Sequence, residues 1–245
     1  LPYACVAARG LRAWTHSVER VMKIYPAIDI RGGRCVRLRQ GDPEQQTVFS
    51  DDPSEMARRW VGMGAEWLHV VDLDGAFGGA PENREAIAGI VGAVSVPVQL
   101  GGGLRGMEQI LAAAEAGIAR VILGTAAFES PDLVATANDA LPGRVAVGID
   151  ARDGCVATEG WTRVTDTEAS SFARQVAGLG ACVIVYTDIG RDGMHTGPNV
   201  AATMDLAESV DAPVIASGGV SDLADVQAVA VEAGSGIEGL IIGSA

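Results

Sequence analysis

The stretch Gly64-Ala-Glu-Trp-Leu-His-Val-Val-Asp72 returns 116 residues later as Gly180-Ala-Cys-Val-Ile-Val-Tyr-Thr-Asp188. Four other blocks recur in the same order, at offsets of up to 121 residues. Such repetition indicates that the second half of the chain is built like the first. The other first-half blocks are residues 24–29, 33–36, 96–103 and 117–126, and their counterparts are residues 145–150, 153–156, 212–219 and 236–245.

The repeated blocks hold short apolar runs bounded by Gly, Asp or Pro, which is typical of buried strands. Helical stretches lie between them, and three have N-cap signals at residues 52–53, 130–131 and 221–222. Four strand–helix units per half, taken twice, predict a (β/α)₈ TIM barrel made of two half-barrels over residues 22–245. An open doubly wound sheet is disfavoured, because no G-x-G-x-x-G motif follows the first strand.

Composition and charge exclude several classes of protein. The formal net charge of −13 argues against a nucleic-acid-binding surface, which needs clustered Lys and Arg. The four cysteines show no C-x-x-C spacing, so neither a zinc site nor a redox motif is indicated. No apolar run approaches the length of a membrane span, and residues 1–21 lack the apolar core of a secretory signal. We therefore expect a cytoplasmic, monomeric protein.

An aspartate follows four of the predicted strands, and barrel active sites lie at this end of the strands. Asp29 and Asp150 follow strands 1 and 5, which face each other across an eight-stranded ring, and Asp188 follows the neighbouring strand 6. Opposed carboxyl groups can act as acid and base on a bound sugar, so we predict Asp29, Asp150 and Asp188 as catalytic residues. Asp72, crowded by Asp74, is expected to cap the next loop instead.

Glycine clusters end the other four strands, in two symmetric pairs. Such loops let backbone N–H groups approach an anion closely. Because strands 7 and 8 supply the usual phosphate site of a barrel, the repeat predicts a second site at strands 3 and 4, and hence a small-molecule ligand with two phosphates. The predicted phosphate-binding residues are Gly102, Gly103, Gly124 and Thr125 on one side, and Ser217, Gly218, Gly219, Gly243 and Ser244 on the other.

Three further positions are candidates for substrate contacts. Arg37 either reaches the substrate from the first loop or is a solvated charge. Trp161 either stacks on a planar ring or packs within the fifth loop. Gly193 and His195 belong to a Gly-rich loop that is long enough to act as a lid. His69 looks incidental, as does the histidine at position 16, and no H-E-x-x-H or comparable ligand cluster is present, so no metal is implied.

Residues 22–245 resemble the histidine-biosynthesis ProFAR isomerase family, which converts a phosphoribosylformimino ribonucleotide aminoaldose to its ketose. The resemblance spans nearly the whole chain. It rests on the motifs Pro26-Ala-Ile-Asp29, Gly33-Arg-Cys-Val-Arg-Leu38, Gln40-Gly-Asp42, Val71-Asp-Leu73, Gln99-Leu-Gly-Gly-Gly103, Gly148-Ile-Asp150, Glu159-Gly-Trp161, Thr187-Asp-Ile-Gly-Arg-Asp-Gly193 and Ser217-Gly-Gly219.

The resemblance implies an Amadori rearrangement of a bisphosphate that uses neither a metal nor a redox cofactor. By motif, Asp29 is the base that takes the proton from C2′ of the aldose. Asp150 or Asp188 is the acid that protonates the ring oxygen, and Thr187 hydrogen-bonds the sugar. The choice between the two acids stays open.

Other activities are alternatives. The related cyclase normally has Cys-Leu-Asp on strand 1, where this chain has Ala27-Ile28-Asp29. Val71-Asp-Leu-Asp-Gly-Ala-Phe77 resembles a bifunctional group that also isomerises phosphoribosyl anthranilate, although that group usually has Arg in place of Glu159. A barrel that binds a sugar phosphate without converting it is a third alternative, but it has no need of opposed carboxyl groups.

The two ends of the chain depart from the family. Met22 looks like the usual family start, which makes residues 1–21 an N-terminal extension, and the chain stops where an eighth helix is expected after strand 8. Apolar residues of the extension fall on one helical face, so it is expected to form a helix near the vacant eighth position. A mis-assigned start together with a truncated gene is the alternative. The apolar residues are Leu11, Trp14, Val18 and Val21.

Overall fold

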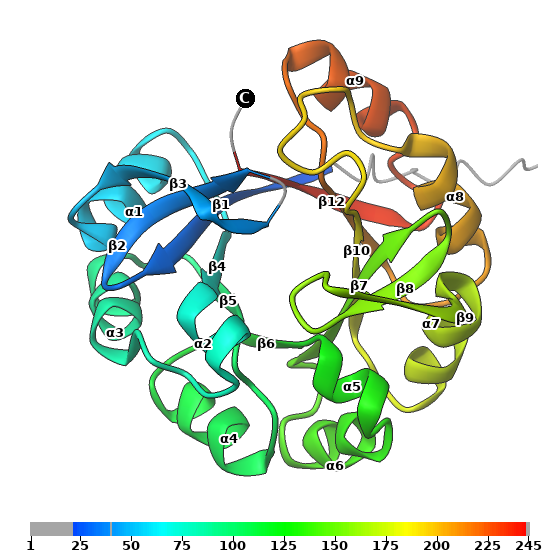
Figure 1. Cartoon of the computed structure of the whole chain (residues 1–245), viewed down its shortest axis with the longest axis horizontal. Coiled ribbons are helices and arrows are strands. Elements are labelled where there is room, and N and C mark those ends of the chain that lie inside the picture. Colours follow the sequence, from blue (N-terminus) through cyan, green and yellow to red (C-terminus); the bar gives the residue numbers. More distant parts are fainter. Residues whose placement is uncertain (1–21, 40, 244–245) are drawn as a thin grey trace, which may run out of the picture.

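A computed structural model describes residues 22–39 and 41–243 of the 245-residue chain, and the extension, Gln40, Ser244 and Ala245 lie outside the described part. Eight parallel strands form a closed ring inside a ring of helices (Figure 1), since β10 pairs with both β11 and β7. The predicted barrel is therefore confirmed. In ring order its strands are β1 (Lys23–Arg31), β4 (Leu68–Asp72), β5 (Val98–Gly101), β6 (Arg120–Leu123), β7 (Val145–Arg152), β10 (Val183–Asp188), β11 (Val214–Ser217) and β12 (Ile237–Ile242).

The helices cover the outside of the ring. Two of the three predicted N-caps are present: the Asp52 carboxylate accepts from the backbone of α1, and Asp222 does the same for α9. The cap predicted at residues 130–131 is wrong, because α6 begins at Asp132 without a side-chain capping bond. The helices are α1 (Pro53–Gly62), α2 (Leu73–Gly78), α3 (Arg84–Ala93), α4 (Met107–Glu115), α5 (Thr125–Glu129), α6 (Asp132–Ala140), α7 (Ala169–Gly178), α8 (Val200–Glu208) and α9 (Leu223–Val231).

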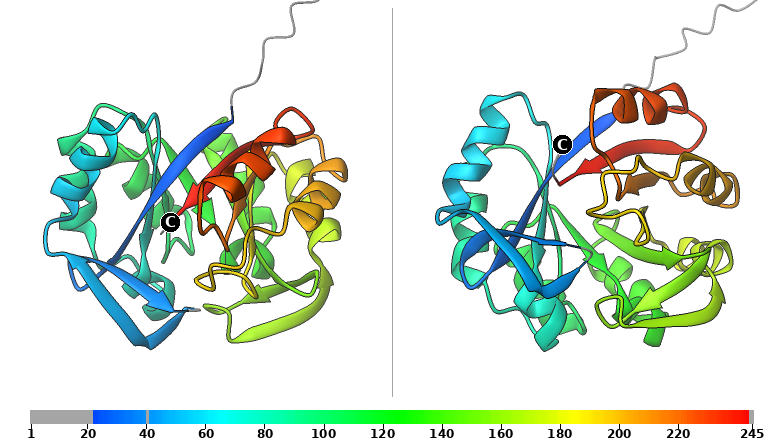
Figure 2. Two further views of the ribbon diagram at one scale, coloured as in Figure 1. Left: turned by 90° about the horizontal axis from the view of Figure 1, so that it is seen from above. Right: turned by 45° about the horizontal axis from the view of Figure 1, so that its top comes forward.

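Two antiparallel hairpins stand where the sequence suggested only long loops. The first joins β2 (Arg34–Arg39) to β3 (Asp42–Ser50), and the second joins β8 (Cys155–Thr158) to β9 (Arg163–Glu168). Each extends the end of a barrel strand, β1 or β7, at matching places in the two halves. Both hairpins lie at the same end of the barrel (Figure 2), where the strands finish.

The opposite end of the barrel is closed by a polar cluster at the starts of the strands. The Arg120 side chain is buried, with its guanidinium carbon 4.4 Å from the centre of the Trp67 ring. Its Nη1 lies 3.4 Å from Glu238, which also accepts a 2.7 Å hydrogen bond from the Tyr25 hydroxyl. This end is therefore filled by side chains, and any ligand must enter from the hairpin end.

Candidate active site

A cavity of about 290 Å³ opens at the end of the barrel where the strands finish. Every barrel strand contributes side chains or backbone to its wall, as expected for the site of a (β/α)₈ enzyme. The contributing strand residues are Ala27, Asp29, His69, Val71, Gly101, Ile122, Gly148, Asp150, Val185, Thr187, Ser217 and Ile241.

Asp29 and Asp150 lie on opposite walls of this cavity. Three strands separate β1 from β7 in either direction around the ring, so the two carboxyl groups face each other across its width. Burial raises the pKa of Asp29 to about 6; the charge of Asp192 adds to the shift and that of Arg37 opposes it. Asp29 thus titrates near neutrality, as a catalytic base requires.

The Asp150 carboxylate is held by the second hairpin. The indole Nε1 of Trp161 donates a 2.7 Å hydrogen bond to its Oδ2. Burial raises the pKa of Asp150, while the bonds from Trp161 and Thr187 partly offset this shift. Trp161 has a φ of 73° and Glu159 a φ of 56°, values that L-residues rarely adopt. The segment between β8 and β9 therefore holds the indole against Asp150 in a strained backbone conformation.

Asp188 does not line the cavity, in contrast to the prediction that it shares the site. Its Oδ2 accepts a 2.7 Å bond from Asn199, and its Oδ1 accepts a 2.9 Å bond from the backbone N–H of Gly190. Side chains alternate along a strand, so Thr187 faces the cavity and Asp188 faces outward. Asp72 has the equivalent role in the first half, where it accepts a hydrogen bond from Asn83. In both halves the asparagine lies eleven residues after the aspartate.

The predicted phosphate-binding clusters line the cavity from two sides. A Cβ on Gly102 would clash with the carbonyl oxygen of Asp72, and one on Gly219 with that of Gly197. Both glycines also have positive φ, so the close approach of the neighbouring backbones depends on them. Gly103, Gly124, Thr125, Ser217, Gly218 and Gly243 line the cavity with them, and Ser244 lies outside the described residues.

Arg37, Gly193 and His195 also line the cavity, as the sequence suggested. A Cβ on Gly243 would lie 3.0 Å from Nη2 of Arg37, so the guanidinium sits beside the second glycine cluster. Of the two interpretations of Arg37, the structure favours the one that places it in the site.

Sequence analysis missed two charged or titratable wall residues, Asp192 and His69. Burial raises the pKa of Asp192, which belongs to the loop after β10, and the charges of Arg37 and His195 oppose this shift. His69 was interpreted as incidental, which is wrong: it lines the cavity and accepts a 2.9 Å bond from the Gln99 amide at Nδ1. Burial lowers its pKa to about 4, so the ring is neutral at pH 7. Residues two apart on a strand point to the same face, as Ala27 and Asp29 do on β1. The same alternation could have predicted that His69 lines the cavity, because it lies two residues before Val71 on β4.

Within residues 22–39 and 41–243, no group of three or more His, Cys, Asp or Glu side chains is placed to bind a metal ion. Cys35, Cys155 and Cys182 are free thiols. None of the helices in this described part is both long and apolar enough to cross a membrane.

Comparison with known proteins gives consistent matches over almost the whole chain. Residues 23–245 match the model of the family described as histidine biosynthesis protein. A protein of Granulibacter bethesdensis is 56% identical over 222 residues, which cover 91% of each chain. One of Syntrophotalea carbinolica is 54% identical over 224 residues, covering 91% of this chain and 92% of its own, and one of Geobacter sulfurreducens is 53% identical over the same shares. All three are named isomerases of an imidazole-4-carboxamide that carries two 5-phosphoribosyl groups.

Proposed function

The chain belongs to the histidine biosynthesis protein family, in which it is an aldose–ketose isomerase, and we propose that it converts ProFAR to its ketose with Asp29 as base and Asp150 as acid. One observation supports this proposal above the others. The two carboxyl groups lie on opposite walls of one cavity, between two clusters of glycines that leave room for backbone contact with anions.

The reaction requires one proton to be given and another taken. The Asp150 carboxyl protonates the ring oxygen of the aminoaldose as the C1′–O bond breaks, which leaves a Schiff base at C1′. The Asp29 carboxylate then removes the proton from C2′, and the resulting enolamine becomes the ketose by tautomerisation. A pKa of about 6 leaves Asp29 ionised at neutral pH, while the raised pKa of Asp150 favours its protonated form.

The glycine clusters suit a substrate with a phosphate at each end. At a net charge of −13 the protein repels anions at long range, so phosphate affinity has to come from local groups. We propose that backbone N–H groups near Gly102, Gly103 and Gly124 hold one phosphate. The cluster at Ser217, Gly218, Gly219 and Gly243 holds the other, with Ser244 as a further candidate; Arg37 adds a cation there.

The remaining substrate contacts follow from the same arrangement. Thr187 faces the cavity beside Asp150 and is proposed to hydrogen-bond the sugar. Trp161 is proposed to stack on the planar imidazole, and Gly193 to let the loop after β10 approach the substrate. We further propose that the enzyme works as a monomer in the cytoplasm, which size-exclusion chromatography with light scattering tests for the oligomeric state.

The acid assignment is tested by three variants assayed with ProFAR. Asp29→Asn and Asp150→Asn are expected to lower kcat by at least about a hundredfold, the usual contribution of a positioned acid or base. Asp188→Asn, which changes an outward-facing hydrogen-bonding group, should keep kcat within a few-fold and lower the free energy of unfolding by about 1 kcal/mol. Normal turnover by Asp150→Asn with loss of turnover in Asp188→Asn would reverse the assignment.

None of the alternative functions is supported by the relatives, whose names give only the imidazole-4-carboxamide substrate. Glu159, where the bifunctional group usually has Arg, is exposed two residues before the cavity-lining Trp161, and its carboxylate lies 3.5 Å from Arg163. We therefore propose that phosphoribosyl anthranilate, whose ring bears a carboxylate, is not turned over. Parallel assays of both aminoaldoses measure this directly, and comparable kcat/KM values for the two would contradict it.

A further inference from the structure

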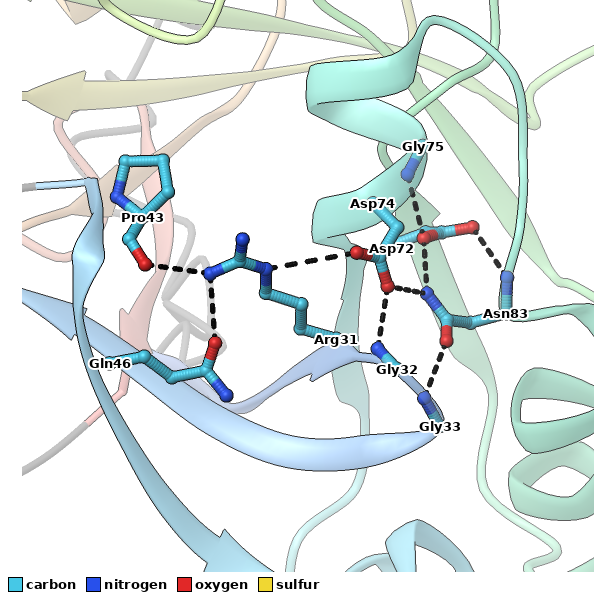
Figure 3. Close-up of polar contacts among 9 residues, drawn as sticks. All are labelled: Arg31, Gly32, Gly33, Pro43, Gln46, Asp72, Asp74, Gly75 and Asn83. Atoms are coloured by element: carbon cyan, nitrogen blue, oxygen red, sulfur yellow. Dashed lines mark hydrogen bonds and ion pairs between the residues drawn. The ribbon is translucent and has the colours of Figure 1, made fainter.

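The guanidinium of Arg31, the last residue of β1, joins three elements, β1, β3 and α2 (Figure 3). Its Nη1 donates to the carbonyl oxygen of Pro43 at 2.7 Å and to Oε1 of Gln46 at 2.8 Å, both on β3. Its Nε lies 3.7 Å from Oδ1 of Asp74 on α2. One side chain thus connects the end of a barrel strand to the far arm of the first hairpin and to the neighbouring helix.

The α2 side of this connection is itself fixed. Oδ2 of Asp74 accepts from the backbone N–H of Gly32 at 2.6 Å and from Nδ2 of Asn83 at 2.9 Å. Oδ1 of Asn83 accepts from the N–H of Gly33 at 2.8 Å, while its amide also bonds the buried Asp72. Because Asp74 is held by these bonds, it provides a fixed point against which Arg31 can hold the hairpin (Figure 3).

The hairpin that Arg31 holds carries part of the active site. Arg37, on β2, projects into the cavity beside Gly243. At the turn of the hairpin, Gly41 packs so closely on the Trp161 ring that a Cβ there would lie 2.6 Å from it. The position of the hairpin therefore sets both the distance of Arg37 from Asp29 and the cover over the indole that bonds Asp150.

We infer that Arg31 is a positioning residue for substrate binding and for the base: it locks the β2–β3 hairpin over the cavity and thereby places Arg37. The inference rests on the proposed function for its kinetic part, whereas the position of the hairpin can be measured without substrate.

The second half of the barrel offers an internal comparison. Arg152 stands two residues after Asp150, as Arg31 stands two residues after Asp29. Its side chain is exposed, and it forms no hydrogen bond or ion pair with any other residue in the described ranges. Equivalent arginines of the two halves thus differ: Arg31 bonds the hairpin, whereas Arg152 bonds no residue in the described ranges. Arg152→Ala is therefore a matched control for Arg31→Ala.

The kinetic experiment compares Arg31→Ala, Arg31→Lys and Arg152→Ala with the wild type on ProFAR across pH 5 to 9. Two charged side chains face Asp29, Arg37 from β2 and Asp192 from the loop after β10. If Arg31→Ala lets Arg37 move away, Asp192 is left unopposed and the pKa of Asp29 rises. We expect the acid limb of kcat/KM to move to higher pH and KM to rise about tenfold, with Arg31→Lys intermediate because an ammonium group cannot reproduce the guanidinium fork. Arg152→Ala should match the wild type.

A second measurement separates this inference from the proposed function. Hydrogen exchange without substrate should be faster over residues 41–48 in Arg31→Ala than in the wild type or Arg152→Ala. Unchanged exchange, or an unchanged KM and acid limb in Arg31→Ala, would overturn the inference. A loss of thermal stability alone would do the same, because it would give Arg31 a purely structural role. If the wild type failed to turn over ProFAR, the proposed function would fall while the exchange result still decided whether Arg31 holds the hairpin.

Discussion

Asp29 and Asp150 reach the cavity because of their place in the alternation of side chains along a strand. Ala27 and Asp29 both line the cavity, as do His69 and Val71, which are likewise two residues apart. Asp188 directly follows the inward-facing Thr187 and so points outward. A difference of one position along the strand therefore decides whether an aspartate lies in the cavity, as Asp150 does, or holds the following loop, as Asp188 does.

The raised pKa of Asp29 makes this proposed base a source of instability. Its pKa is higher in the folded protein than the ordinary value of 3.8, so the unfolded state ionises first and stability falls as pH rises from about 4 to about 6. Above pH 6 the folded protein holds an unfavourable buried charge. Asp29→Asn removes it and should raise the free energy of unfolding at pH 8 by about 2 to 3 kcal/mol. Urea denaturation at pH 8 and at pH 4 checks this, because the gain should vanish at the lower pH.

The indole of Trp161 should set the alkaline limit of activity. Its hydrogen bond lowers the pKa of Asp150 against the larger effect of burial, so Trp161→Phe should raise that pKa further. Because Asp150 is proposed to act in its protonated form, the alkaline limb of the kcat profile should move to higher pH. Trp60→Phe is the matched control, since the Trp60 indole nitrogen is buried without a partner among the described residues. If the alkaline limb does not move in Trp161→Phe, then the titration of Asp150 is not what causes that limb.

At the scale of elements, the glycines at the end of β5 differ in role: Gly102 supports the fold, whereas Gly101 borders the proposed ligand position. A Cβ on Gly101 would lie 3.7 Å from Ile122, an ordinary contact, while one on Gly102 would clash with Asp72 at a φ of 96°. Gly102→Ala should therefore lower the free energy of unfolding by about 2 kcal/mol or more. Gly101→Ala should keep its stability but raise KM about tenfold, because a methyl group enters the cavity beside the proposed phosphate position. A factor of ten corresponds to about 1.4 kcal/mol. Thermal melts and initial rates of the two variants distinguish these outcomes.

The barrel strands were predictable from the sequence because they are short, apolar and repeated, whereas the hairpins were not. β3 reads Asp-Pro-Glu-Gln-Gln-Thr-Val-Phe-Ser, a mostly polar run that lies outside the core, with Phe49 59% exposed. Nothing in its periodicity distinguishes such a strand from a loop. The hairpin forms because β2 continues the ladder of β1 and because Arg31 bonds its far arm, which are contacts between segments that a local pattern does not contain.

The same distinction holds for the site. The repeat was enough to place two glycine clusters and two carboxyl groups around one cavity, since symmetry fixes which strands face each other. It did not predict Asp192, whose counterpart at the offset of 116 residues is the uncharged Ala76. The bond between Trp161 and Asp150 also depends on backbone angles that the sequence suggests only through the glycine between Glu159 and Trp161.

At the scale of the whole molecule, the two ends of the barrel have different roles. The end where the strands finish holds the proposed catalytic groups, and the end where they start holds groups that stabilise the fold. The cluster around Arg120 lies at the strand starts, away from the glycine clusters and the hairpins. Within it, Glu238 bonds both Arg120 and Tyr25, and Lys23 lies 3.7 Å away. Among the described residues, none of the groups that close this end lines the cavity, and their one electrostatic link to it is the charge of Arg120, which helps burial to lower the pKa of His69. A change there should therefore affect folding far more than turnover.

Arg120→Met tests this division. It keeps much of the side-chain volume but leaves the partly buried Glu238 without its buried cation and removes the stacking on Trp67. Breaking a buried pair is costly, so the free energy of unfolding should fall by about 2 to 4 kcal/mol, while kcat on ProFAR measured well below the melting temperature should stay within a few-fold of the wild type. Arg58→Met, which removes an exposed pair with Asp52, should change stability by less than about 1 kcal/mol. Asp29→Asn is expected to show the reverse pattern, higher stability without activity. A parallel loss of kcat and stability in Arg120→Met would mean that the closed end is coupled to the catalytic end through the barrel interior.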